Sequence, residues 1–142
     1  MVAMTLLDPS PEALAALLVS MTEVEWPTTE ADRVRFLERF GLHDIDVLHP
    51  DERDPDSAWG RFSADLSSNV SGSSTMFRSE FLGLALFCYD EQLENGPQAR
   101  TGYDALREEL ARRLGLPDED WGSPTEPVCG WRTGPLLSLI HI

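Results

Sequence analysis

Apolar residues recur at helical spacing in the first forty residues. A helix is predicted from Pro11 to about Met21, with Ser10 as its N-cap and proline in the first helical position. Its apolar stripe, with i, i+3, i+4, i+7 spacing, comprises Leu14, Leu17, Leu18 and Met21. A second helix is predicted over residues 30–40, capped by Thr28 or Thr29 and ended by Gly41. Its apolar side comprises Val34, Phe36, Leu37 and Phe40.

A third helix is predicted to begin after Thr101, its N-cap, and to end at Gly115 and Pro117. Its stripe comprises Tyr103, Leu106, Leu110 and Leu114. Two ion pairs with i,i+4 spacing are expected on its surface, Glu108–Arg112 and Glu109–Arg113.

Strand patterns fill the remaining apolar segments. Residues 59–66 alternate and predict a half-buried strand, and Ile45, Val47 and Leu48 could form a short one. Residues 81–89 are apolar throughout and predict a central strand buried on both faces, where Gly83 indicates a bulge or close packing. Residues 67–75 are polar and predict a loop, and residues 127–132 predict a final strand.

This order of elements indicates the fold class. Helix, helix, strands, helix and strands follow one another, and short connections join adjacent strands. We therefore expect an α+β fold with a mainly antiparallel sheet of about four or five strands and helices packed on one face. The length of 142 residues suits a single domain, assigned to residues 1–136.

Composition is typical of a soluble globular protein, with 42% hydrophobic and 25% charged residues. No apolar run approaches the roughly 20 residues of a membrane-spanning helix. The N-terminus lacks the features of a secretory signal, so a cytoplasmic location is expected. In that compartment Cys88 and Cys129, each within an apolar stretch, are expected to be buried thiols.

The formal net charge is −14, and acidic residues outnumber basic ones in both halves of the chain. Such a charge repels nucleic acid, whose binding requires a positive surface. It attracts and orients basic proteins, although it can also serve solubility alone. The charge therefore favours a basic protein partner and argues against a nucleic-acid or membrane partner.

Motifs of known chemistry are lacking. The sequence contains no phosphate-binding loop, dinucleotide-binding turn, nucleophile elbow or zinc pattern, so no cofactor, no metal and no enzymatic activity are expected. A metal site could be drawn from His43 and His49 with neighbouring acids, but loop composition explains the grouping. An unrecognised enzyme would need a pocket with carboxylates of displaced pKa, for example around Asp65 and Glu80.

The acidic stretch between residues 44 and 56 is the candidate partner-binding surface. Its members are Asp44, Asp46, Asp51, Glu52, Asp54 and Asp56, with Trp59 as a possible aromatic anchor. The alternative is an ordinary solvated loop. Of the four tryptophans, two are expected in the core, with Trp59 and Trp121 exposed.

Several short motifs resemble a family of small acidic actinobacterial proteins, a domain of unknown function. The motifs are residues 36–42 (FLERFGL), 76–83 (MFRSEFLG), 114–117 (LGLP) with Trp121, and 131–133 (WRT). Genes of such proteins often lie beside secretion and polymorphic-toxin genes. The resemblance implies an immunity-like role, the neutralisation of a toxin by shape and charge, and supplies no catalytic residues.

These observations together predict a non-enzymatic, immunity-like protein-binding domain that docks to a basic partner. The alternative is a chaperone or adaptor for a secreted protein, acting as a dimer with an exposed apolar groove. A charge-matched partner distinguishes the first, and a stable dimer the second.

The last six residues, Leu137 to Ile142, are expected to be foreign to the natural protein. They back-translate without mismatch as CTG-TCT-CTT-ATA-CAC-ATC, the transposon end used in tagmentation sequencing libraries. All 11 basic residues are arginine, as in a GC-rich genome, where this AT-rich run is out of place. The natural chain is then expected to continue differently after Leu136; the alternative is a genuine β-strand.

Overall fold

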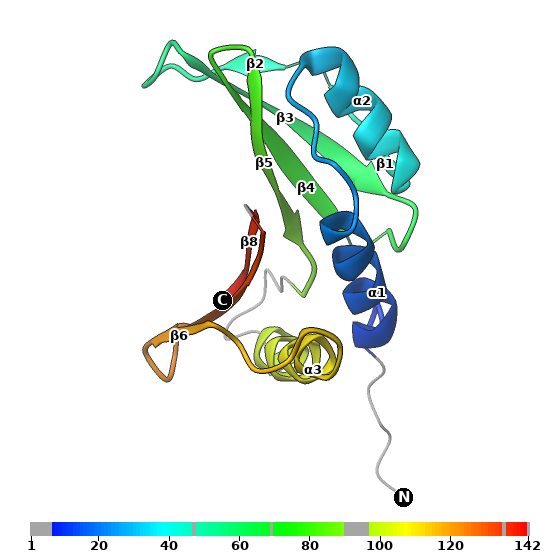
Figure 1. The fold of residues 1–142 in the computed structure, drawn as a ribbon, viewed down its shortest axis with the longest axis vertical. Helices are drawn as coiled ribbons and strands as arrows, with labels where there is room; N and C mark the ends of the chain where they lie inside the picture. The colour runs from blue at the N-terminus through cyan, green and yellow to red at the C-terminus, as the bar shows by residue number, and fades with distance from the viewer. Residues whose placement is uncertain (1–6, 47, 69, 90–96, 135, 142) are drawn as a thin grey trace, which may run out of the picture. The chain divides into compact units, whose positions relative to one another are not determined.

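The structure is a computed structural model that describes residues 7–46, 48–68, 70–89, 97–134 and 136–141. Its helices are α1 (Pro11–Thr22), α2 (Glu30–Arg39) and α3 (Pro97–Leu114). Its strands are β1 (Leu42–Asp44), β2 (His49–Pro50), β3 (Ser57–Ala64), β4 (Ser71–Phe77), β5 (Glu80–Phe87), β6 (Glu119–Gly122), β7 (Pro127–Thr133) and β8 (Leu136–His141). The predicted order of elements and the antiparallel α+β class are confirmed (Figure 1).

The strands form two separate sheets, and the chain divides into two compact units. One unit comprises residues 25–88, with α2 and the five-stranded sheet A of β1 to β5. The other comprises residues 1–24 and 89–142, with α1, α3 and the three-stranded sheet B of β6 to β8. By their place in the sequence, we call residues 25–88 the inner unit and residues 1–24 with 89–142 the outer unit. Sheet A has the predicted number of strands, whereas sheet B was not anticipated as a sheet of its own.

In the inner unit, α2 lies against one face of sheet A (Figure 1). Thr29 caps the helix by accepting a hydrogen bond from the Asp32 amide, and Gly41, with φ of 70°, follows its end as predicted. Phe36 packs against Trp26 and Phe81, with ring centroids 5.0 and 6.1 Å away. The covered face of β3 and β4 is buried at every second residue: Gly60, Phe62, Ala64, Gly72, Ser74 and Met76.

Strand β4 corrects the prediction of a polar loop over residues 67–75. The segment from Ser71 is a strand between β3 and β5, although its sequence is rich in serine and glycine. Neighbours on both sides satisfy its backbone hydrogen bonds, and this tertiary pairing outweighs a low strand propensity. Small side chains suit its covered face, because the Phe62 ring lies over Gly72.

Gly72→Ala is expected to lower the free energy of unfolding by about 2–3 kcal/mol. A Cβ at this position would collide with the Ala85 carbonyl oxygen and the Phe62 ring, and neither can move without disturbing the sheet. Gly83→Ala on the adjacent strand is the control, since no atom lies within 4 Å of its added Cβ. Urea unfolding followed by circular dichroism compares the two variants, and equal losses would contradict this packing.

Strand β5 corrects a second prediction. Sheet A has the order β1-β3-β4-β5, so β5 is an edge strand and not a central one. Its side chains are half-buried or exposed, with Leu82 67% and Phe87 51% exposed. The predicted irregularity at Gly83 is confirmed as a register shift opposite Thr75 and Met76. Its open surroundings exclude the alternative of close packing there.

In the outer unit, α1 and α3 pack against each other. The α1 N-cap is confirmed, because Ser10 Oγ accepts a hydrogen bond from the Ala13 amide. Strand β7 is tied to the end of α3, because the indole Nε1 of Trp131 donates a hydrogen bond to the Gly115 carbonyl 2.9 Å away. The buried side chains of this unit include Leu14, Met21, Tyr103, Leu106, Leu110, Cys129 and Trp131.

Helix α3 begins five residues before the predicted position. Its first residue is Pro97, so Thr101 lies inside the helix and the prediction of an N-cap there is wrong. Proline is favourable in a first helical turn, where its missing N–H needs no partner. The Glu108–Arg112 ion pair is confirmed, whereas Glu109 pairs with Arg112 and not with the predicted Arg113.

Residues 136–141 form β8, which pairs with β7 in antiparallel register. This is the structure expected under the alternative that the tail is a strand; that residues 137–142 come from a sequencing adapter stays a prediction. Among the helices that the structure describes, none combines the length and apolar character needed to cross a membrane.

Both cysteines are free thiols. Cys129 is fully buried, as predicted, and Cys88 is half-buried. Burial raises the pKa of the Cys88 thiol to about 11, which keeps it in the unreactive protonated form near neutral pH.

Candidate functional site

The acidic stretch of residues 44–56 belongs to the connection between α2 and β3. It begins at the last residue of β1 and contains β2, and both of these short strands pair with β3 at one edge of sheet A. His49 lies directly opposite Trp59 in this pairing. The structure therefore brings the acidic stretch and the predicted aromatic anchor together in the inner unit.

Asp44 forms an ion pair with Arg33 within the fold. Its two carboxylate oxygens accept hydrogen bonds from Nη1 and Nη2 of Arg33, at 3.1 and 3.0 Å. The Arg33 guanidinium also donates to both carboxylate oxygens of Glu30, at 2.9 and 2.8 Å, and to Ser74 Oγ at 3.0 Å. The hydrogen bonds to Glu30, ahead of those to Asp44, hold the pKa of Arg33 above its ordinary value. Asp44 thus neutralises an arginine that is only 2% exposed.

Asp46 is also occupied. Its carboxylate accepts two hydrogen bonds from the Arg61 guanidinium, at 2.8 and 3.1 Å, and lies 3.4 Å from His49 Nε2. The Arg61 side-chain hydrogen bonds are the largest cause that lowers the pKa of Asp46. This carboxylate orients neighbouring side chains and is less available to a partner than the acids that follow it.

The loop from Asp51 to Asp56 presents the remaining four acids. Asp54 shapes the loop, because its carboxylate accepts hydrogen bonds from the Asp56 amide and the Ser57 hydroxyl. Asp56 lies 3.4 Å from the exposed Arg78 guanidinium, and the Asp51 carboxylate accepts a hydrogen bond from the Arg53 amide. Glu52 is exposed and makes no ion pair within the part of the chain that the structure describes. Asp51 and Glu52 therefore carry the charge that remains most available.

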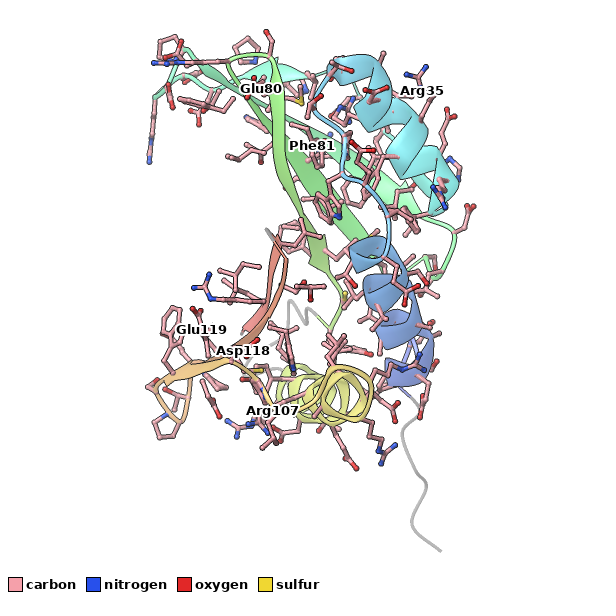
Figure 2. All side chains as sticks on the ribbon, in the orientation of Figure 1. Arg35, Glu80, Phe81, Arg107, Asp118 and Glu119 are labelled. Atoms are coloured by element: carbon pink, nitrogen blue, oxygen red, sulfur yellow. The ribbon has the colours of Figure 1, made fainter. Side chains whose placement is uncertain are left out.

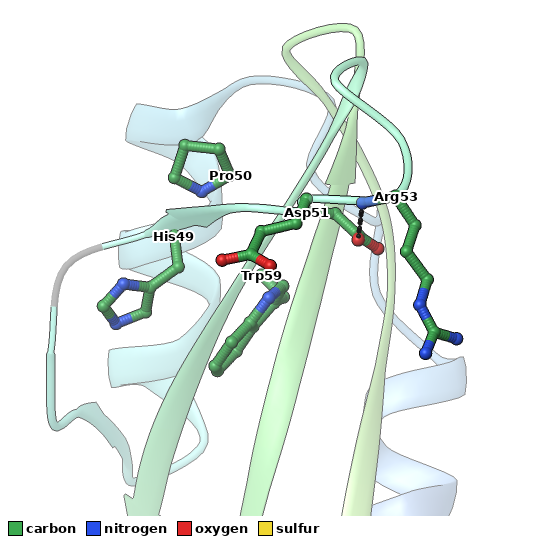
Figure 3. Close-up of a pocket in the computed structure, with 6 residues that line it drawn as sticks. His49, Pro50, Asp51, Arg53 and Trp59 are labelled. Carbon is green, nitrogen blue, oxygen red and sulfur yellow. Dashed lines mark hydrogen bonds between the residues drawn. The ribbon is translucent and has the colours of Figure 1, made fainter.

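A hollow lies beside this loop (Figure 3). It is lined by His49, Pro50, Asp51, Glu52, Arg53 and Trp59. The rings of His49 and Trp59 stand together with centroids 5.0 Å apart, while the Arg53 side chain points away from them (Figure 3). The hollow thus combines an aromatic wall with two unpaired carboxylates, an arrangement that suits the side chain of a cationic residue.

The tryptophans follow the prediction. Trp59 is 38% and Trp121 58% exposed, whereas Trp131 is 2% exposed. Trp26 is half-buried between Phe36 and Phe81. Trp59 is therefore the exposed tryptophan that stands beside the acidic loop.

The structural role of Arg33 was not predicted from the sequence. A signal was present, because Arg33, Phe36, Leu37 and Phe40 have the i, i+3, i+4, i+7 spacing of a buried stripe. An arginine within such a stripe needs acidic partners, and Asp44 and Glu30 supply them. Asp44 pairs with Arg33 and Asp46 with Arg61, so two of the six candidate acids are structural and the other four lie in the loop.

The structure does not join the residues suggested for a metal site or an enzyme. His43 Nε2 lies 2.9 Å from Asp65 Oδ1, whereas His49 contacts Asp46 and Trp59. Asp65 follows the end of β3 that pairs with Ser71, and Glu80 pairs at the opposite end of β4. Within the described ranges, no group of three or more His, Cys, Asp or Glu residues is placed to hold a metal ion.

Comparisons with known proteins give no relative. No protein-family model, curated protein or solved structure matches the chain. The resemblance to small acidic actinobacterial proteins therefore stays a prediction, and the geometry of the inner unit carries the functional argument alone.

Proposed function

We propose that this protein is a non-enzymatic, immunity-like binding domain that neutralises a basic partner protein. The observation that supports this most directly is the hollow beside the loop of residues 51–56, where Asp51 and Glu52 flank the exposed Trp59. A lysine or arginine of the partner can place its charge between the carboxylates and its aliphatic part against the indole. The net charge of −14 orients the partner during approach.

The gene beside the one for this chain supplies the natural test partner, since immunity proteins are expected next to their toxins. If that gene encodes a basic protein, its co-expression with this chain should relieve its toxicity, and the two proteins should co-purify. Failure to form a complex with a basic, toxic neighbour would overturn the proposal.

Glu52→Lys with Asp51→Asn is expected to slow association with that partner by about tenfold at low salt. The two changes remove the unpaired charge of the hollow, and the salt dependence of association should weaken with them. Surface plasmon resonance at two salt concentrations measures the association rate of each variant. Asp51→Asn keeps an oxygen that can still accept the hydrogen bond from the Arg53 amide, so the loop should retain its shape.

Two matched controls separate a local site from the overall field. Glu38→Lys with Asp104→Asn makes the same change of net charge at exposed positions that do not line the hollow and should slow association less. Trp59→Ala should instead speed dissociation, since buried aromatic anchors contribute about 2 kcal/mol or more at interface centres. Equal slowing by both charge variants would locate binding in the diffuse field and remove the hollow from the proposal.

The second candidate is a chaperone or adaptor that acts as a dimer. The exposed apolar side chains Leu82 and Phe87 of β5 favour it, because an adaptor needs an accessible apolar surface for its client. This candidate requires the protein to bind an extended apolar segment of a neighbouring secreted protein. Binding that grows stronger with salt would support it over the basic-partner proposal.

A further inference from the structure

Among the described residues of the inner unit, strand β5 has a neighbouring strand on one side only. It pairs with β4 on one side, and every second backbone N–H and C=O points away from that neighbour. One of these groups is occupied, because the Phe81 amide donates to the Thr28 carbonyl at 2.9 Å. In the described residues of the inner unit, the edge is otherwise unpaired from Leu82 to Phe87.

The two edges of sheet A differ in how they resist pairing. The opposite edge consists of the three-residue β1 and the two-residue β2, interrupted by charged residues and ended by Pro50. Short strands, charges and proline are the usual devices that keep sheet edges from pairing with other chains. Residues 83–89 have none of them, since this run contains neither a charged residue nor a proline and lies beyond the bulge at Leu82.

We propose that two copies of this chain pair through their β5 strands, antiparallel to each other, and so join their two sheets A into one. A two-fold axis at Ala85 places Leu84 opposite Leu86 of the second copy and Gly83 opposite Phe87, so that the paired residues lie beyond the bulge at Leu82. Every contact along the paired edge is then apolar. Antiparallel pairing of identical strands is self-complementary and closes at two copies.

Charge argues against a basic partner at this edge and leaves the uncharged β5 of a second copy as the matching surface. Each chain carries a net charge of −14, so two copies repel each other over most of their surfaces. Residues 81–89 form a neutral strip where this repulsion is weakest. A basic protein gains nothing from a neutral strip and is drawn to the acidic loop instead. The pairing does not rest on the proposed binding of a basic partner, whereas the second candidate function also requires a dimer.

Ala85 offers the sharpest variant. It is exposed on β5, and in the proposed pairing the two copies of residue 85 lie directly opposite each other at the two-fold axis. Ala85→Lys and Ala85→Glu should each weaken dimerisation by at least about tenfold through like-charge repulsion. An equal mixture of the two should restore it, because opposite charges then face each other.

The measurement is sedimentation equilibrium from low micromolar to millimolar concentration, on the full chain. The wild type should form a dimer whose dissociation constant falls as salt is raised. Ser71→Lys is the control: Ser71 is exposed one strand inward on β4, so edge pairing should tolerate the change, whereas face-to-face packing of sheets would not. Circular dichroism establishes that each variant is folded.

Hydrogen exchange of the wild type gives a second test that needs no variant. Amides of residues 82–88 should exchange more slowly at high than at low protein concentration. A monomer at every concentration, or protection confined to the apolar edge strand β8, would overturn the proposal. Because this dimerisation strengthens with salt while binding at the acidic loop weakens, failure of one leaves the other to be judged separately.

Discussion

Replacing Arg33 with methionine is expected to lower the free energy of unfolding of the inner unit by about 3 kcal/mol. The side chain is 2% exposed and donates five hydrogen bonds, to Glu30, Asp44 and Ser74. Methionine keeps much of the volume of the side chain. It leaves Asp44 without its cation, and it leaves the buried Ser74 hydroxyl without the hydrogen bond from Arg33. Removal of one member of a buried ion pair is costly because the remaining charge stays poorly solvated. Breaking a buried ion pair costs about 3–5 kcal/mol, and the partial exposure of Glu30 and Asp44 keeps the expected loss near the lower value.

Arg35 provides a control on the same helix. It also pairs with an acid three residues away, Asp32, but its side chain is 72% exposed and points outward (Figure 2). Arg35→Met should therefore change the free energy of unfolding by no more than about 0.5 kcal/mol. Urea unfolding monitored by tryptophan fluorescence measures both variants. Similar losses in the free energy of unfolding for Arg33→Met and Arg35→Met would show that the buried pairs of Arg33 stabilise the fold no more than an exposed pair does.

A double substitution separates the stranded charge from the lost packing. Adding Asp44→Asn to Arg33→Met removes the carboxylate that has no cation, so the double variant should be more stable than the sum of the two single effects predicts. Additive losses would mean that Asp44 is well solvated without Arg33. The acid would then be available to a partner after all, as the sequence had suggested.

Trp131→Ala is expected to destabilise the outer unit by about 3–5 kcal/mol. The indole is 2% exposed, and the variant would leave a cavity and an unpaired Gly115 carbonyl. Trp131→Phe fills part of the cavity but still lacks the hydrogen bond to Gly115, so a smaller loss of roughly 1–3 kcal/mol is expected. Hydrogen exchange of the α3 amides reports on this unit specifically.

Trp121 is the matched control for this prediction. It lies on β6 and is 58% exposed, so Trp121→Ala should cost less than about 1 kcal/mol. The two variants remove the same side chain from adjacent strands of one sheet. A loss for Trp121→Ala as large as that for Trp131→Ala would place the core of the outer unit on the other face of sheet B.

Local signals in the sequence determined α1 and α2 with their caps, whereas the start of α3 was predicted wrongly. Ser10, Thr29 and Gly41 act on backbone groups within a few residues of themselves, so their effect is independent of the rest of the fold. The α+β class followed from the order of such segments. The exposure of Trp59 beside an acidic loop was predicted in the same way, from its neighbours in the chain.

Only the tertiary structure decided which strands lie where and which acids are free. Residues 71–77 became a strand because β3 and β5 supply partners, and apolar β5 became an edge because the described sheet adds no strand beyond it. Asp44 and Asp46 pair with arginines 11 and 15 residues away, distances at which periodicity carries no information. Strand pairing and charge neutralisation depend on chain segments that meet only after folding, which is why sequence patterns left both open.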